Sequence, residues 1–161
     1  MKKTLFMMVG PAGSGKSTWI AKEMAEADET SSLVSRDEIR FSLLTDTDSY
    51  FDKEEQVFEI FINRIQELIN NSFTENIYVD ATHLTEKARN RVFDALCLDD
   101  VDIVLIVVAP NLETALRQNE MREGLAKVPR SVIRRMYYQF QKPTYNEKYK
   151  YTNILEVCED E

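Results

Sequence analysis

The stretch GPAGSGKS, from Gly10 to Ser17, holds three of the four glycines in the chain. It matches the pattern G-x-x-x-x-G-K-[ST], in which glycines let backbone N–H groups turn inward around the phosphates of a nucleotide. An apolar run precedes it and a helical pattern follows it, which is the order of strand, loop and helix that the motif requires. The stretch therefore predicts a P-loop, and its spacing differs from the G-x-G-x-x-G of dinucleotide-binding folds.

The composition of this loop predicts which ligand groups its residues bind. The loop N–H groups and the N-terminus of the following helix would bind the phosphates of ATP. Lys16 would reach the β- and γ-phosphates and take part in catalysis, and the Ser17 hydroxyl would bind Mg²⁺. The expected ATP-binding residues are Gly10, Gly13, Ser14, Gly15, Lys16, Ser17 and Thr18.

Apolar, β-rich runs alternate with helical patterns along the chain, which is typical of parallel strands joined by helical crossovers. The expected strands are Thr4–Val9, Ser32–Ser35, Asn76–Ala81, Val101–Ala109 and Asn153–Val157. The expected helices are Ser17–Ala27, Glu54–Asn71, Thr85–Leu98, Leu112–Glu123 and 130–142. A chain of 161 residues fits one domain. We therefore expect an α/β fold of three layers with a mostly parallel sheet of about five strands.

The segment RDEIR, residues 36–40, follows the second expected strand, at the edge of the sheet where open α/β folds bind their ligands. There the carboxylate of Asp37 could accept the proton of an attacking hydroxyl, and Arg40 could bind an anionic acceptor. We therefore expect Asp37 to be catalytic and both residues to bind the acceptor. The alternative is an ordinary helix start, in which Asp37 favours the helix dipole and pairs with Arg40.

Asp80 lies at the end of the third expected strand, in IYVDATHL. A carboxylate at this place could orient the water shell of Mg²⁺ or hold a basic side chain, so Asp80 joins the expected substrate-binding residues. The alternative is that it only caps the next loop. His83 is the only histidine of the chain, and we expect it to be a loop residue without chemistry.

The fourth glycine, Gly124, lies between two helical patterns that are rich in basic residues. A flexible break there suggests a lid over about residues 117–135, which would bring arginines over the transferring phosphate and exclude water. Arg122 is the arginine nearest to the break, so we expect it to be the catalytic arginine of the lid. The alternative is a helix end with solvated basic side chains.

The net charge of −8 is unevenly distributed. Residues 117–150 hold nine basic and three acidic side chains, whereas the rest of the chain is strongly acidic. The basic segment suits an anionic partner, although solvated helix faces would give the same count. Overall acidity is unfavourable for a long nucleic acid, whose affinity depends on phosphate neutralisation. A short or single-stranded end is therefore the easier nucleic-acid partner.

Neither a membrane location nor a disulfide is expected. The longest apolar run, residues 101–110, is interrupted by Asp102 and is too short to span a bilayer. The N-terminal residues lack the features of a signal peptide. Neither Cys97 nor Cys158 implies a structural disulfide, so the reducing cytoplasm is the expected compartment.

The chain contains, in this order, GPAGSGKSTW, RDEIR, DATHL followed by RNR, and RQNEMREGLAKVP followed by MYYQF. In order and spacing these stretches resemble the phage-type polynucleotide 5′-hydroxyl kinases, from Met1 to about Lys142. The resemblance implies a P-loop kinase fold with a helical lid and a tunnel-like acceptor site. It also implies that Lys16 and Ser17 serve ATP and Mg²⁺.

The resemblance further implies roles for single residues. Asp37 would be the general base for a nucleic-acid 5′-hydroxyl, and Arg40 would hold the neighbouring phosphate. Asp80 would be the carboxylate at the strand tip, and Arg122 would face the donor phosphates. Well-known phage members also carry a phosphatase domain with an Asp-x-Asp-x-Thr motif. The nearest string here, DTDSY at residues 46–50, has serine in place of threonine and is expected to form an acidic loop.

We therefore expect one P-loop kinase domain, residues 1–161, without a phosphatase domain. Its expected activity is the Mg²⁺-dependent transfer of the γ-phosphate of ATP to the 5′-hydroxyl end of DNA or RNA. Stand-alone kinases of small molecules use the same motif frame, so a kinase of a small hydroxylated metabolite or nucleoside is an alternative. A second alternative is an ATP-binding module without a phosphoryl acceptor.

Overall fold

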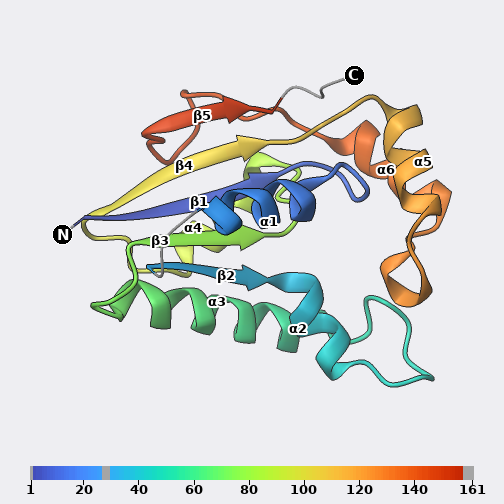
Figure 1. Ribbon diagram of the computed structural model, residues 1–161, viewed down its shortest axis with the longest axis horizontal. Coiled ribbons are helices and arrows are strands. Elements are labelled where there is room, and N and C mark those ends of the chain that lie inside the picture. The colour runs from blue at the N-terminus through green and yellow to red at the C-terminus, as the bar shows by residue number, and fades with distance from the viewer. Residues whose placement is uncertain (1, 27–29, 158–161) are drawn as a thin grey trace.

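A parallel sheet of five strands forms the centre of this computed structural model, which describes residues 2–26 and 30–157 (Figure 1). The strand order is β2-β3-β1-β4-β5, and every neighbouring pair is parallel. The strands are β1 (Lys3–Val9), β2 (Ser31–Ser35), β3 (Asn76–Asp80), β4 (Val101–Val107) and β5 (Asn153–Glu156). Because β2 and β3 lie on one side of β1 and β4 and β5 on the other, the topological switch point lies at the carboxyl end of β1.

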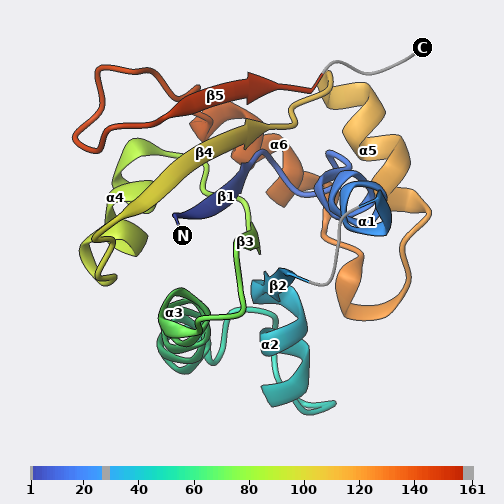
Figure 2. The same cartoon turned by 60° about the vertical axis from the view of Figure 1, so that its left-hand side comes forward.

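Helices cover both faces of the sheet. The first helix, α1, packs on one face, and α3 and α4 pack on the other (Figures 1 and 2). The helices are α1 (Lys16–Glu26), α2 (Arg36–Leu43), α3 (Glu54–Asn70), α4 (Glu86–Asp94), α5 (Leu112–Glu120) and α6 (Arg130–Gln139). The expected α/β fold with a five-stranded parallel sheet is thus confirmed.

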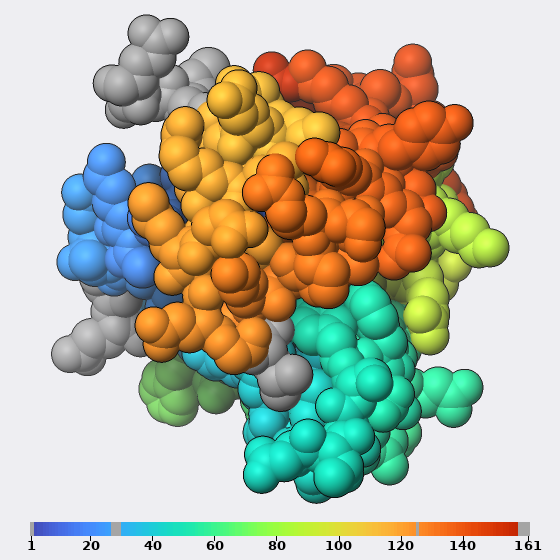
Figure 3. Space-filling view, turned by 90° about the vertical axis from the view of Figure 1, so that its right-hand side faces the viewer, coloured from blue at the N-terminus to red at the C-terminus, as the bar shows by residue number. Residues whose placement is uncertain are grey.

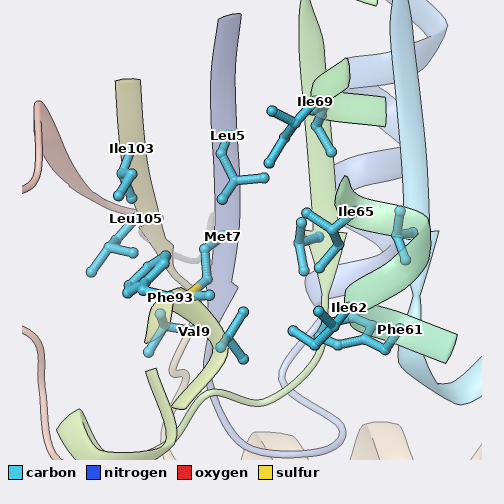
Figure 4. Packing of buried hydrophobic residues seen from close by; sticks show 14 of the residues in the cluster. Leu5, Met7, Val9, Phe61, Ile62, Ile65, Ile69, Phe93, Ile103 and Leu105 are labelled. Atoms are coloured by element: carbon cyan, nitrogen blue, oxygen red, sulfur yellow. The ribbon is translucent and has the colours of Figure 1, made fainter. Parts of the chain in front are cut away.

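The side chains of β1 alternate between two hydrophobic cores. Leu5, Met7 and Val9 belong to the core beneath α3 and α4 (Figure 4). Met8 points to the other face and packs with Ile20 of α1. Because both faces are covered, the central strands are almost continuously apolar. Truncating one of these fully buried side chains to alanine would destabilise the fold by about 2–5 kcal/mol.

The expected strands are all present in the expected order, with small differences at their ends. Strand β3 ends at Asp80 and not at Ala81, and β4 ends at Val107 and not at Ala109. The N–H of Val108 still donates to the carbonyl of Val9 at 2.8 Å, and beyond it the chain continues to α5. The expected end of the first helix, Ala27, lies outside the described residues.

The predicted C-terminal ends of three other helices were too far along the chain. Thr85 caps α4 as expected, by accepting a hydrogen bond from the Ala88 N–H at 3.1 Å, but α4 ends at Asp94 and not at Leu98. Similarly, α5 ends at Glu120 and not at Glu123. Helix α6 ends at Gln139 and not at 142 because the N–H of the second residue beyond its end donates to the carbonyl of Leu84 at 2.8 Å.

A buried ion pair attaches the segment between α6 and β5 to α4. The Arg89 guanidinium is fully buried and donates to both carboxylate oxygens of Glu147, at 3.0 and 2.8 Å. It also donates to the carbonyls of His83 and Gln141, at 2.8 and 3.1 Å. Burial alone would raise the pKa of Glu147, but hydrogen bonds from Arg89 and Tyr151 hold it below its ordinary value. Arg89, the first arginine of RNR, is therefore a structural residue.

Cys97 has a free thiol and is exposed to solvent. Cys158 lies outside the described residues. No helix in the part of the chain that the structure describes has the length and apolar character to cross a bilayer.

Candidate active site

A cavity of about 210 Å³ lies at the carboxyl edge of the sheet. Figure 3 looks onto this edge and shows α6 and the segment before it (orange) against the loop between α2 and α3 (blue-green). The cavity lining includes every residue that the sequence analysis expected in catalysis, acceptor binding or metal binding: Lys16, Ser17, Asp37, Arg40, Asp80 and Arg122. Residues from four separate parts of the chain thus meet around one space.

Two glycines of the P-loop are required by close contacts. A Cβ atom on Gly10 would lie 2.0 Å from the carbonyl oxygen of Val108. Gly13 has φ +78°, and a Cβ there would lie 2.7 Å from the carbonyl oxygen of Ala115. No side chain fits at either position, so the loop can follow this path only with glycine.

Lys16 folds back over the P-loop. Its Nζ atom donates to the carbonyls of Gly10 and Pro11, both at 2.8 Å, and to Ser14 Oγ at 3.4 Å. Burial lowers the pKa of Lys16 to about 8, although the charge of Asp80 acts in the opposite direction. A buried ammonium that is bound by neutral oxygens fits an anionic ligand in the loop, because phosphate oxygens would stabilise its charged form.

Ser17 and Asp80 form a pair of oxygen ligands beside Lys16. The Ser17 hydroxyl donates to Asp80 Oδ2 at 2.6 Å, which joins the start of α1 to the end of β3. Mg²⁺ prefers oxygen ligands and is usually bound by one or two protein oxygens together with water and phosphate. The chemistry of this pair therefore fits Mg²⁺ bound with a nucleotide.

Asp37 lies in the first turn of α2, whose N-cap is Ser35. The hydroxyl of Ser35 accepts a hydrogen bond from the Glu38 N–H at 3.3 Å. Asp37 Oδ1 accepts hydrogen bonds from the guanidinium of Arg40 and the hydroxyl of Tyr50. Its other oxygen, Oδ2, has no hydrogen-bond partner among the described residues, and about half of the side chain is exposed. One carboxylate oxygen is therefore fixed and the other is available at the cavity.

Arg40 is almost fully buried and uses most of its N–H groups inside the protein. Its Nε and Nη2 atoms donate to the carboxylate of Glu54, at 2.7 and 3.0 Å. Its Nη1 atom donates to Asp37 and, at 2.7 Å, to the Tyr50 hydroxyl. Asp37 and Arg40 therefore form the ion pair that is predicted if RDEIR is an ordinary helix start. One N–H of Nη2 has no partner within residues 2–26 and 30–157 and could reach an acceptor.

Three residues of this acceptor region were not expected from the sequence, namely Tyr50, Phe51 and Glu54. The Tyr50 ring lies 4.2 Å from the Arg40 guanidinium, and burial raises the pKa of its hydroxyl, which stays protonated as a donor. Phe51 packs against Tyr50 edge to face and is half exposed. The only sequence signal for these residues is an aromatic pair within an otherwise acidic loop.

The loop that carries Tyr50 and Phe51 is held by its own polar side chains. Asp48 accepts from the Thr45 N–H at 2.8 Å, and Asp52 accepts from the Ser49 N–H at 2.7 Å. Lys53 donates from Nζ to the carbonyl of Leu43 at 2.7 Å. The acidic string DTDSY therefore lies in an ordered loop, which presents Tyr50 and Phe51 to the cavity.

Arg36 is a further cation of the cavity. Its guanidinium lies 5.6 Å from the ring centres of Phe58 and Phe61 and donates to Glu54 Oε2 at 3.2 Å. Burial lowers the pKa of Arg36 below its ordinary value. Arg36 and Arg40 thus share the carboxylate of Glu54.

The expected lid, residues 117–135, comprises the end of α5, a loop and the first half of α6. Asn119 is fully buried and joins the two ends of this loop, because its amide donates to the carbonyl of Val128 at 2.6 Å and accepts from its N–H at 2.9 Å. Gly124 has φ +61°, which favours glycine. Arg122 donates to the Ala126 carbonyl at 3.4 Å and lines the cavity. Asn119 had no signal in the sequence.

His83 is buried beneath the P-loop. Its Nδ1 atom lies 2.6 Å from the carbonyl oxygen of Met8, and because a carbonyl only accepts, Nδ1 carries the proton. Burial lowers the pKa of His83 to about 3, so the ring is neutral. The neighbouring Thr82 carbonyl accepts from the Gly10 N–H at 2.9 Å. The loop after β3 thus supports the start of the P-loop, a role that the sequence analysis did not foresee for His83.

The AAA domain family matches residues 5–143 of the chain. A comparison with curated proteins gives no match. Among solved structures, two chains from Pnkp1/Rnl/Hen1 complexes, one described as an RNA repair complex, match with TM-scores of 0.61 and 0.67 at 24% and 21% identity. These matches cover 72% and 86% of this chain but only 38% and 44% of those chains, so this chain spans less than half of their length.

Two other solved structures match nearly the whole chain. A gluconokinase from Sinorhizobium meliloti 1021 has a TM-score of 0.58 at 17% identity, and the match covers 96% of this chain and 81% of that one. Chaetomium thermophilum Kti12, in complex with ADP-AlF3, has a TM-score of 0.65 at 12% identity, with coverage of 97% and 89%. The resemblance to polynucleotide kinases holds for the fold, which kinases of other substrates share. The chain belongs to the AAA domain family, and its fold is that of a P-loop kinase.

Proposed function

We propose that this protein is an ATP- and Mg²⁺-dependent kinase that transfers the γ-phosphate of ATP to the 5′-hydroxyl end of DNA or RNA. The observation that carries the proposal is the cavity in which Lys16 and Ser17 of the P-loop face Asp37, with Arg122 of the lid on the same lining. A P-loop that only hydrolyses or senses a nucleotide does not need a carboxylate with one free oxygen at this place.

In the proposed reaction, Asp37 Oδ2 accepts the proton of the acceptor hydroxyl while Arg40 and Tyr50 hold Oδ1. Lys16 and Arg122 stabilise negative charge on the moving phosphoryl group, and closure of the lid excludes water. When Mg²⁺ is bound, Ser17 and Asp80 would hold it, and it would supply neutralisation of the phosphate charge. Positioning of the hydroxyl and the phosphate in line supplies much of the rate enhancement.

The acceptor region has the groups that a nucleotide end would use. Phe51 offers a half-exposed ring for stacking, and Arg36 and Arg40 offer N–H donors for a phosphate. The cavity of about 210 Å³ admits a terminal sugar but not a whole oligonucleotide. The remainder of a nucleic-acid acceptor would therefore lie outside the cavity.

The same volume also supports a second candidate, a kinase of a small hydroxylated metabolite or nucleoside. The gluconokinase and a sugar kinase among the solved structures show that this fold serves such acceptors in other proteins. In this reading Asp37, Lys16 and Arg122 have the same roles, and only the acceptor differs. The ATP-binding module without an acceptor is the third reading.

The test is transfer of label from γ-labelled ATP to a 5′-hydroxyl oligonucleotide, run beside a panel of nucleosides and sugars. The proposal expects labelled oligonucleotide with the wild type, none with Asp37→Asn, and wild-type activity with Glu38→Gln, a matched change at the exposed neighbour. Labelled sugar or nucleoside with inert oligonucleotides would select the second candidate. Turnover of ATP that no acceptor stimulates, and that Asp37→Asn leaves unchanged, would select the third.

A further inference from the structure

The outer face of α6 is unlike the rest of this acidic protein. Between Lys127 and Asn146 the chain has five basic residues and no acidic residue. Arg130, Arg134 and Arg135 of α6 are all exposed. Tyr138 follows Arg134 by four residues, so their side chains lie on the same helix face.

Three side chains of this face do not take part in the packing of the fold, namely those of Arg134, Arg135 and Tyr138. None of them makes a hydrogen bond, ion pair or ring contact with another residue in 2–26 and 30–157. By contrast, Arg130 lies 3.7 Å from Glu120 in an ion pair. Tyr138 is 92% exposed, whereas Ile133 on the opposite side of the helix is fully buried. The two guanidiniums and the exposed ring of Tyr138 therefore have no contact among the described residues by which they would stabilise the fold.

Helix α6 borders the cavity with its packed side and carries these residues on its exposed side. Met136, directly after Arg135, lines the cavity, and so does half-exposed Phe51 of the loop opposite. Figure 3 shows α6 and that loop meeting on one side of the molecule. From Arg130 to Tyr138 the helix axis rises about 12 Å, which exceeds one nucleotide step. The exposed side of α6 is therefore long enough to contact more than one nucleotide of a strand whose end enters the cavity that α6 borders.

We propose that the α6 face, defined as Arg130, Arg134, Arg135 and Tyr138, binds the single-stranded part of a nucleic acid next to the end that enters the cavity. The inference rests on the proposed function and adds a second contact region to it. Arginines would bind phosphates without regard to sequence, and Tyr138 would stack on a base. Stacking needs an unpaired base, and the acidic remainder of the protein repels a long duplex, so the strand is single.

The test compares a 12-nucleotide acceptor with a 5′-hydroxyl dinucleotide, which can fill the cavity but cannot extend along α6. The double charge reversal Arg134→Glu with Arg135→Glu should raise the KM of the 12-mer at least about tenfold and leave kcat/KM of the dinucleotide within about twofold. It should also reduce the slope of log KM against log salt by about 0.7 for each phosphate that the variant no longer neutralises. Tyr138→Ala should weaken binding of the 12-mer about fivefold or more, and Tyr138→Phe should restore it.

The matched control is Lys22→Glu with Lys87→Glu, which changes the net charge equally at exposed sites of α1 and α4. Equal losses in the control and the α6 variant, or equal losses for both acceptors, would overturn the proposal. Fluorescence anisotropy of a 12-mer labelled at its 3′ end separates this inference from the proposed function. If the protein transfers phosphate only to small molecules, the proposed function fails. The proposal for the α6 face is contradicted separately if anisotropy at low salt shows the same oligonucleotide affinity for the wild type and for the variant with Arg134→Glu and Arg135→Glu.

Discussion

The donor region and the acceptor region of the cavity are built in different ways. The donor region is one continuous stretch, Gly10–Ser17, in which backbone conformation and a single lysine define the site. The acceptor region is a set of side chains from α2, α3 and the loop between them, joined by hydrogen bonds to Asp37 and Arg40. In the donor region, close backbone contacts leave no room for a side chain at Gly10 or Gly13. In the acceptor region, a few substitutions could change which acceptor is bound. Substitutions should therefore separate the two regions.

The largest effects are expected from removing the central residue of each region. Asp37→Asn should lower the rate of transfer about 10²–10⁴-fold, which is typical of a general base, with the Kd of ATP unchanged. Lys16→Ala should lower the rate about 100-fold or more and also weaken ATP binding. Transfer kinetics and calorimetric titration of ATP measure both quantities. A large loss of ATP affinity in Asp37→Asn would show that the two regions are not separate.

Arg122→Ala should lower kcat by about 100-fold, because a preorganised cation at the phosphoryl group is removed. Lys127→Ala is the control, since Lys127 lies in the same loop but pairs with Glu120 at 3.0 Å on the surface. The measurement is kcat at saturating ATP and acceptor for both variants. An unchanged kcat in Arg122→Ala would refute its catalytic assignment.

Tyr50→Phe should lower kcat about tenfold with little change in the KM of either substrate. It removes the hydroxyl donor to Asp37 but keeps the ring beside Arg40, and a hydrogen bond to a charged group contributes about 1.5–3 kcal/mol. Arg40 remains as a donor to Oδ1 of Asp37, so the loss should appear in kcat and not in the Kd of ATP. Tyr149→Phe is the control, because it removes a hydroxyl donor to Asp94 outside the cavity. A purely structural role for Tyr50 would lower the urea midpoint of unfolding and leave kcat of the folded enzyme unchanged.

Replacement of His83 should have the smallest effect on turnover. It should, however, change the pH dependence of the free energy of unfolding. Burial lowers its pKa from 6.5 to about 3, so below pH 6.5 the unfolded chain binds a proton that the folded chain does not. Stability should therefore fall as the pH falls through this range, by about 2 kcal/mol between pH 7.5 and 5.0. Urea unfolding of the wild type and of His83→Gln measures it, and the variant should lose most of this dependence. Because His83 is the only histidine, equal slopes in both proteins would contradict the assignment.

The sequence was sufficient for the positions of the strands along the chain and for the P-loop, because both depend on local patterns. Glycine spacing fixes the loop, and β-rich runs fix the strands. It also predicted that Asp37 and Asp80 lie at one edge, since parallel strands end at the same side of a sheet, and that Arg122 reaches this edge from the segment around Gly124. Their catalytic roles remain predictions.

Contacts between distant segments could not be predicted in the same way. Tyr50 reaches Asp37 only because Asp48 and Asp52 fold the intervening loop, and Asn119 reaches Val128 only because the lid segment closes on itself. The burial of His83 depends on the position of β3 beside β1, which a single residue in a loop does not reveal.

The ion pair of Arg89 with Glu147 has a practical consequence for how this chain can be shortened. The match to the AAA domain family ends at residue 143, but the carboxylate that neutralises fully buried Arg89 lies four residues beyond it. A chain cut after Pro143 would keep every residue of the cavity and lose this partner. An uncompensated buried charge destabilises a protein by about 3–5 kcal/mol, so the truncated protein should be aggregation-prone and open to proteolysis. The boundary of the family pattern is therefore not the boundary of the stable folding unit.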